Sequence, residues 1–194
     1  MGRTISRILA PLAVLAALPA AAQDAPSAQQ VAQGPPPAWA KASEPLALPA
    51  NPSGLAFVRA QDVIIHLDAK GERSYSGQRI VLLQPQALQL GNIALSWNPA
   101  AGTPVVHAIK IHRGSETIDV LSATKFEILR REDQLEAAMI TGTLTAVLKV
   151  PDLRVGDELE VAYTLPSGDP TLGDQNAGML FVRRLLHRAD IAWG

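Results

Sequence analysis

Apolar and polar residues alternate with a period of two from residue 55 onward, and turn-forming residues interrupt the alternation at short intervals. This period is typical of strands that bury one face and expose the other. Short helical turns are expected at residues 85–90 and 135–139. The expected strands are residues 57–67, 72–83, 92–97, 105–112, 116–120, 123–129, 143–150, 158–165 and 179–187. We therefore predict an all-β fold, an antiparallel β-sandwich-like domain with about nine strands and little helix.

The segment before these strands has the composition of a linker. Residues 23–54 are rich in Pro, Ala and Gln and include Pro35-Pro36-Pro37. Proline lacks a backbone donor and favours extended polyproline geometry, so such a segment buries little apolar surface. Trp39 is the exception, because it either anchors the segment on the folded domain or lies exposed, and the sequence leaves both open.

The first 22 residues have the three-part layout of a secretory signal peptide. Arg3 and Arg7 form a positive n-region, residues 8–18 are apolar, and Ala20-Ala21-Ala22 supplies small residues before a cleavage site. The apolar run is shorter than the roughly 20 residues that a spanning helix needs, and no later stretch reaches that length. We therefore expect a periplasmic or secreted protein whose mature chain has no transmembrane span.

Residues 55–194 are expected to form the β-sandwich-like domain. The sequence stops at Gly194 within what resembles a continuing strand region, so we expect truncation at the C-terminus. The sequence is compatible with either a fragment or a natural short form.

The chain contains no cysteine and has a formal net charge of −1. The lack of cysteine excludes disulfides, thiol nucleophiles and thiolate metal sites, so the core must be stable through burial alone. A charge so near neutral gives no basis for nucleic-acid binding.

The four histidines are the first candidates for chemistry. His107 and His112 are five positions apart, so in a regular strand they point to opposite faces and cannot share a metal without a bulge. His66 and Asp68 share a face, which fits metal ligation and fits a solvated strand end equally. No third ligand is indicated, so we predict no metal site. A metal-dependent hydrolase using His66 and Asp68 stays as an alternative.

Other polar patterns also favour structural explanations. The three Ser-Gly pairs, Ser53-Gly54, Ser76-Gly77 and Ser167-Gly168, fit turns rather than a nucleophile elbow. The neighbouring carboxylates Glu132/Asp133 and Asp157/Glu158 are expected to be solvated in turns, and the oxygen-rich residues 169–176 lack the spacing of a calcium loop. The basic residues Arg183, Arg184, His187 and Arg188 are typical of a charged edge strand. We therefore predict no catalytic, cofactor-binding or metal-ligating residue, and no cofactor.

Several segments together resemble a known family. They are residues 92–99, 106–114, 118–121, 126–132 and 142–146, followed by Leu153-Arg-Val-Gly-Asp-Glu-Leu-Glu-Val-Ala-Tyr163. In this order they are similar to domain-of-unknown-function family 3857, over residues 57–173. The resemblance implies a β-sandwich-like domain without established catalytic residues, on the N-terminal side of a transglutaminase-like domain in bacterial envelope proteins. A Cys-His-Asp triad would belong to that later domain, and no triad residue carries over to this cysteine-free chain.

These observations favour a non-catalytic exported module. We expect it to be the N-terminal accessory or interaction domain of a transglutaminase-like envelope protein, with that domain or another envelope protein as its partner. A carbohydrate- or peptide-binding sandwich is the second hypothesis, because Tyr75, Trp97 and Tyr163 could supply stacking faces, although core positions explain them better. The sequence does not identify a ligand.

The signal-peptide assignment predicts the first residue of the mature protein. Cleavage between Ala22 and Gln23 should leave Gln23 at the N-terminus of the exported chain, because small residues at the preceding positions define the cleavage site. N-terminal sequencing or intact-mass analysis of protein recovered from outside the cytoplasm checks this. A chain that retains Met1 and stays in the membrane fraction would contradict the assignment.

Overall fold

The structure is a computed structural model that describes residues 30–68, 71–130, 142–167 and 189–193. The strands are β1 (Ala32–Gln33), β2 (Ala56–Asp68), β3 (Gly71–Leu82), β4 (Asn92–Trp97), β5 (Val105–Arg113), β6 (Glu116–Asp119), β7 (Glu127–Arg130), β8 (Leu144–Lys149), β9 (Glu158–Ser167) and β10 (Ala189–Trp193). Two short 3-10 helices are η1 (Pro85–Gly91) and η2 (Pro99–Ala101). None of the helices in the described part of the chain combines the length and apolarity that a bilayer crossing requires.

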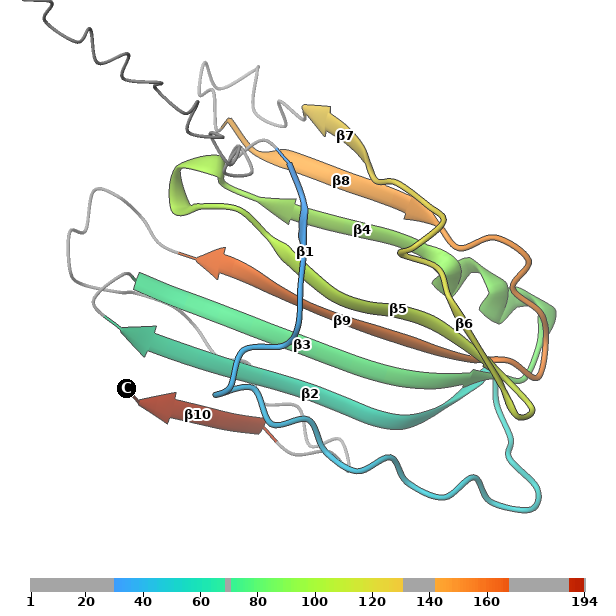
Figure 1. Cartoon of the computed structure of the whole chain (residues 1–194). Coiled ribbons are helices and arrows are strands. Elements are labelled where there is room, and N and C mark those ends of the chain that lie inside the picture. The colour runs from blue at the N-terminus through green and yellow to red at the C-terminus, as the bar shows by residue number, and fades with distance from the viewer. Residues whose placement is uncertain (1–29, 69–70, 131–141, 168–188, 194) are drawn as a thin grey trace, which may run out of the picture.

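The strands form two sheets, as Figure 1 shows. The larger sheet has seven strands in the order β1-β5-β9-β3-β2-β10, with β6 also paired to β5, and the smaller sheet has the order β4-β8-β7. The pairs are antiparallel except that β1 runs parallel to β5 and β10 runs parallel to β2. The all-β sandwich-like fold predicted from the sequence is therefore confirmed.

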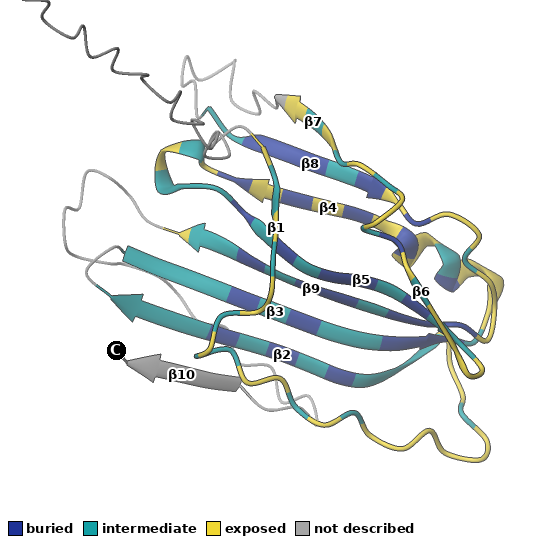
Figure 2. Cartoon of the chain, viewed as in Figure 1, coloured by how far each residue is buried: buried dark blue, intermediate teal, exposed yellow. Residues whose placement is uncertain are grey.

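The main hydrophobic cluster lies between the two sheets, and Figure 2 shows buried positions along β4, β5, β8 and β9. Side chains from the smaller sheet pack against side chains from β5 and β9 of the larger one. The contributing residues include Ile93, Leu95 and Trp97 of β4, Leu144, Ala146 and Leu148 of β8, Val106, Ile109 and Ile111 of β5, and Leu159 and Val161 of β9. Alternate residues of each strand enter this layer, which is the period of two seen in the sequence.

Most expected strands that fall on described residues form within a few positions of the expected bounds. The expected strand 123–129 is shorter and later, as β7 (Glu127–Arg130), because residues 121–123 form a turn after β6. The helical turn at residues 85–90 is confirmed as η1. The strand at 179–187 and the helix at 135–139 lie outside the described residues.

Two features were not anticipated. The strands β1 and β10 are short, and each pairs in parallel with its neighbour. A parallel pair needs a long connection instead of a tight hairpin turn, so no hairpin pattern in the sequence predicts it. Ser76 and Gly77, expected in a turn, lie within β3. The space above Gly77 is filled by the ring of Tyr75, whose hydroxyl would lie 2.8 Å from an added Cβ, so a side chain at Gly77 would displace this ring.

The core position of Ile109 generates a stability prediction. This side chain is 0% exposed between the sheets, so Ile109→Ala should lower the free energy of unfolding by about 2–5 kcal/mol, and Ile109→Val by about 0.5–1.5 kcal/mol. Urea denaturation of the purified chain measures both. Lys125→Ala, at an exposed site, is the control and should change stability by no more than about 0.5 kcal/mol. Equal effects at the two sites would contradict the assignment of the core.

Candidate functional site

The larger sheet has a second face, which points away from the smaller sheet and is rich in polar side chains. We call it the polar face. Cross-strand partners in a sheet project to the same side, and the registers pair His66 with Arg73, Tyr75 with Thr164, and Arg79 with Glu160. The polar face consists of Asp62 and His66 of β2, Arg73, Tyr75 and Arg79 of β3, His107 and His112 of β5, and Glu158, Glu160 and Thr164 of β9.

The proline-rich N-terminal segment crosses the polar face, passing from β1 toward β2 (Figure 1). The backbone N–H of Gly34 donates to the carbonyl of Val106 on β5 at 3.2 Å. Further along, the indole of Trp39 stacks on the imidazole of His66 on β2, with ring centroids 4.8 Å apart and planes 7° apart. Trp39 therefore anchors the segment, which decides between the two alternatives that the sequence left open.

Ser43 fixes the segment to β2 through a buried carboxylate. Its backbone N–H donates to Asp62 Oδ2 at 3.0 Å, and its hydroxyl donates to Asp62 Oδ1. The carboxylate of Asp62, only 4% exposed, thus has a donor on each oxygen, as a buried charge requires. Three residues later, the backbone N–H of Leu46 donates to the carbonyl of Arg59.

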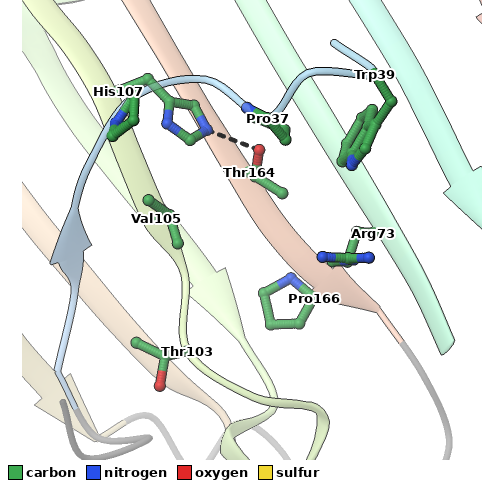
Figure 3. A pocket seen from close by; sticks show the side chains of 9 residues that line it. Pro37, Trp39, Arg73, Thr103, Val105, His107, Thr164 and Pro166 are labelled. Carbon is green, nitrogen blue, oxygen red and sulfur yellow. Dashed lines mark hydrogen bonds between the residues drawn. The ribbon is translucent and has the colours of Figure 1, made fainter. Parts of the chain in front are cut away.

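A cavity of about 160 Å³ lies between this segment and the polar face. Figure 3 shows residues of both parts around it. The segment contributes two prolines and Trp39, while β3, β5, β9 and the loop before β5 contribute the other side. The lining residues are Pro35, Pro37, Trp39, Arg73, Thr103, Val105, His107, Thr164 and Pro166. The cavity therefore depends on docking of the N-terminal segment.

Hydrogen bonds fix the imidazole of His107 at one end of this cavity. Its Nδ1 lies 2.9 Å from the carbonyl oxygen of Gly34, which can only accept, so Nδ1 carries a proton. In the neutral ring Nε2 then accepts from the hydroxyl of Thr164 at 2.7 Å, the bond drawn in Figure 3. The ring also stacks on Tyr75 with centroids 5.8 Å apart. His107 thus ties the segment to β9, and both of its nitrogens are engaged.

His66 and Asp68 lie close together, as the sequence predicted. His66 Nε2 is 3.4 Å from Asp68 Oδ2, but the guanidinium of Arg73 contacts the same carboxylate oxygen. A cation at this oxygen would compete with Arg73. Within the described ranges of the chain, no group of three or more His, Asp or Glu side chains is placed to hold one metal ion.

His107 and His112 occupy the same face, contrary to the expectation for a regular strand. The register of β5 against β9 shifts between Val106 and Ala108, so a bulge turns His107 to the polar face. The two rings nevertheless have separate partners, since His112 Nε2 donates to Glu160 at 2.6 Å and His107 is bound to Thr164. The bulge that could have allowed a shared metal does not bring the rings to one site.

Tyr75 lies in a second, smaller cavity of about 50 Å³, lined in part by Asp62, Arg79 and Glu160. Its side chain is buried, and burial raises the pKa of the phenol, with the nearby negative charges of Asp62 and Glu160 acting in the same direction. The hydroxyl therefore keeps its proton at neutral pH. With Tyr75 3% and Trp97 4% exposed, both are core residues rather than stacking platforms.

Asp157, the acid of the Val155-Gly156-Asp157 segment, is buried rather than solvated, which corrects the expectation from the sequence. Its carboxylate accepts from Arg113 Nε and Nη2, both at 2.8 Å, and from the backbone N–H of Arg154 at 2.8 Å. Arg113 also donates to the backbone carbonyl of Asp152 at 2.7 Å. These bonds attach the loop before β9 to the end of β5, so the acid of this segment has a structural role.

The pKa of Asp157 lies below its ordinary value, mainly because the side chain of Arg113 donates a hydrogen bond to the carboxylate. Burial raises this pKa, and the backbone N–H of Arg154 lowers it further. The same pair raises the pKa of Arg113. The carboxylate is therefore held ionised in the folded chain.

Glu158 is also buried, again contrary to the expectation of a solvated turn. It is 7% exposed, and its two oxygens lie 2.6 Å from Arg59 Nη1 and 2.5 Å from Arg79 Nε. Arg59 further donates to the backbone carbonyl of Leu46 at 2.6 Å. A carboxylate on β9 thus connects β2, β3 and the N-terminal segment. No local pattern indicated these partners, because they are distant along the chain.

The remaining candidates could not be placed. Residues 169–176, the basic residues at 183–188 and the carboxylates at 132–133 all lie outside the described residues. Of the cavity-lining side chains, Arg73, Thr103 and Thr164 were not singled out by sequence analysis. Two other lining residues had been singled out from the sequence, Trp39 as a possible anchor and His107 as a candidate for chemistry.

Comparisons with known proteins agree with the resemblance seen in the sequence. A family model described as "Domain of Unknown Function with solved-structure structure (DUF3857)" matches residues 69–186. A crystal structure from Parabacteroides distasonis ATCC 8503, described as a "putative protease", is similar over 57% of this chain, with 16% identity and a TM-score of 0.49. The similar region covers 22% of that protein, so the chain spans only a small part of its length. A search of curated proteins gives no match.

The Asp157–Arg113 pair generates a prediction about stability. Asp157→Asn should lower the free energy of unfolding by about 1.5–3 kcal/mol, because it weakens charge-assisted hydrogen bonds to a buried carboxylate. Asp152→Asn is the matched control, since Asp152 also contacts Arg113 but is 62% exposed, and its effect should be much smaller. Chemical denaturation at neutral pH measures both, and equal losses would show that burial of Asp157 is not decisive.

The same carboxylate predicts a dependence of stability on acid. A folded-state pKa below the unfolded value contributes stability above the unfolded pKa of about 3.9 and loses it as the pH falls through the folded pKa. The free energy of unfolding should therefore fall between about pH 5 and the lower folded value. Asp157→Asn should flatten this part of the curve. If the free energy of unfolding of the variant fell with decreasing pH as steeply as that of the original chain, the prediction would be contradicted.

Proposed function

Because this chain belongs to the DUF3857 family of domains of unknown function, we propose that it is an exported, non-catalytic interaction module. Its partner is a transglutaminase-like domain of an envelope protein, located after the family domain in the same chain or in a second protein. The family assignment supports a role as one domain among others. The signal-peptide pattern of residues 1–22 supports export to the periplasm or beyond.

The observation that carries the proposal is an exposed apolar end of the sandwich. Leu55, Leu90 and Val155 are 46%, 40% and 49% exposed. Backbone hydrogen bonds place them around the end of β3: the carbonyl of Leu55 accepts from Leu83 and Gln84, and Gly156 donates to Leu82. Leu90 belongs to η1, which follows at once. Large apolar side chains gathered at one end favour contact with another protein surface.

The environment of three buried carboxylates supports a non-catalytic role. Asp62, Asp157 and Glu158 are all buried, and each binds donors from other segments of the chain. Their partners connect the N-terminal segment, the strands of the larger sheet and the loop before β9. A carboxylate bound in this way stabilises the fold and is not available as a general base.

Binding of a carbohydrate or peptide is a second candidate function, favoured by the cavity beneath Trp39. Its walls combine prolines, an indole and two threonine hydroxyls with a single arginine. Pockets with apolar walls and a few convergent polar groups are typical of ligand sites. This candidate uses a different surface from the apolar end and is compatible with it.

The docking proposal predicts a complex with a defined surface. The reading frame downstream of this coding sequence should encode a transglutaminase-like domain with a Cys-His-Asp set. That domain, expressed separately, should co-elute with the mature chain in size-exclusion chromatography. Leu90→Glu or Val155→Glu should weaken the complex by about tenfold or more, because each places a charge in the contact.

Leu129→Glu is the matched control, because Leu129 is 44% exposed on β7 of the smaller sheet, away from the apolar end. It should leave the affinity unchanged. The absence of a complex, or equal losses in all three variants, would contradict the proposal, and a downstream frame without such a domain would leave only a second protein as its source.

A further inference from the structure

The cavity beneath Trp39 has the size of a small ring. Its volume of about 160 Å³ is close to that of an engineered protein cavity of about 150 Å³ that binds benzene. One wall comes from Pro35, Pro37 and Trp39, and the opposite wall from the ends of β5 and β9, where Val105 and Pro166 supply apolar surface (Figure 3). A ligand must therefore present a compact body with at least one apolar face, such as an aromatic ring or the C–H face of a sugar.

Contacts within the chain hold several of the wall residues in place. Proline rings have few conformations, and the stack on His66 fixes the plane of Trp39. The hydrogen bonds from His107 to Gly34 and to Thr164 hold the other end. Because these side chains are already ordered, binding costs little conformational entropy.

Arg73 is the charged group of this cavity, and no carboxylate lines it. One terminal nitrogen, Nη2, contacts Asp68, which fixes the orientation of the guanidinium. Among the described residues no hydrogen bond is made by Nη1 or by the buried Nε, although the side chain is 38% exposed. Figure 3 shows the guanidinium between Trp39 and Pro166, at the edge of the cavity. Nη1 therefore keeps its hydrogen-bonding capacity at the edge of this largely apolar space.

We propose that this cavity binds a small carboxylate carried on a ring-sized body, with Arg73 as the carboxylate ligand. A guanidinium matches a carboxylate in both charge and planar geometry. The ring lies between Trp39, Pro37 and Pro166, and the Thr103 hydroxyl provides a further polar contact. The site is separate from the apolar end of the sandwich, so it does not depend on the docking proposal.

The carboxylate can come from a peptide terminus or from a sugar acid, and matched probes distinguish these sources. Isothermal titration of the mature chain uses N-acetyl-L-phenylalanine against its neutral amide, and D-galacturonic acid against D-galactose. We expect one acid to bind with an affinity at least tenfold above that of its neutral counterpart, because a hydrogen bond to a charged group contributes about that much. The acid that binds identifies the source.

Three variants assign the binding to this cavity. Arg73→Gln should weaken the acid about tenfold or more, and Thr103→Phe should abolish binding by filling the space without changing charge. Arg154→Gln is the matched control, because Arg154 also pairs with an aspartate but lies 60% exposed beside Asp152. It should leave the affinity unchanged. Circular dichroism checks that each variant is folded. If Arg73→Gln does not fold, Thr103→Phe still tests the site, because Thr103 lies in a loop.

The proposal is overturned if neither acid binds, or if the neutral probes bind as tightly as the acids. Equal effects of Arg73→Gln and Arg154→Gln would also overturn it, as would full binding by Thr103→Phe. These outcomes leave the docking proposal untouched, since its variants lie at Leu90 and Val155.

Discussion

Successive side chains of a strand point to opposite faces, so the central strands of the larger sheet, β5 and β9, contribute to two environments at once. On β9, Leu159 and Val161 enter the core, while Glu158, Glu160 and Thr164 lie on the polar face. A polar face at the centre of a sheet needs partners for its buried charges. The N-terminal segment binds the carboxylate of Asp62, and Arg59 and Arg79 bind that of Glu158. The need to pair these buried charges gives the N-terminal segment a structural role on this face of the sheet.

The two layers over the larger sheet are therefore different in kind. The smaller sheet covers one face with apolar contacts, as in other sandwiches. The proline-rich segment covers part of the other face through an aromatic stack and individual hydrogen bonds, without a regular ladder beyond β1. Such a cover leaves spaces between its contacts. The cavity beneath Trp39 is one of these, and its mixed walls follow from the two different parts that enclose it.

The architecture was predictable from the sequence where it depends on local pattern. The bounds of β4 and the helical turn at η1 follow from alternation and from Pro85. The site was less predictable, because its contacts join residues far apart in sequence. Asp157 and Glu158 have the local pattern of a solvated turn, and only Arg113, Arg59 and Arg79 explain their burial. The bulge at His107 is likewise a product of tertiary pairing rather than of composition.

The position of β10 has a consequence for the order in which the larger sheet forms. Residues 189–193 pair with residues 63–67, so the outer edge of β2 receives this partner only after all the residues between them have been synthesised. Until then β2 offers unpaired backbone groups that can recruit another strand. During this interval the nascent chain is therefore prone to aggregation through that edge. Chaperones that shield nascent edges would be most valuable to this chain at that stage.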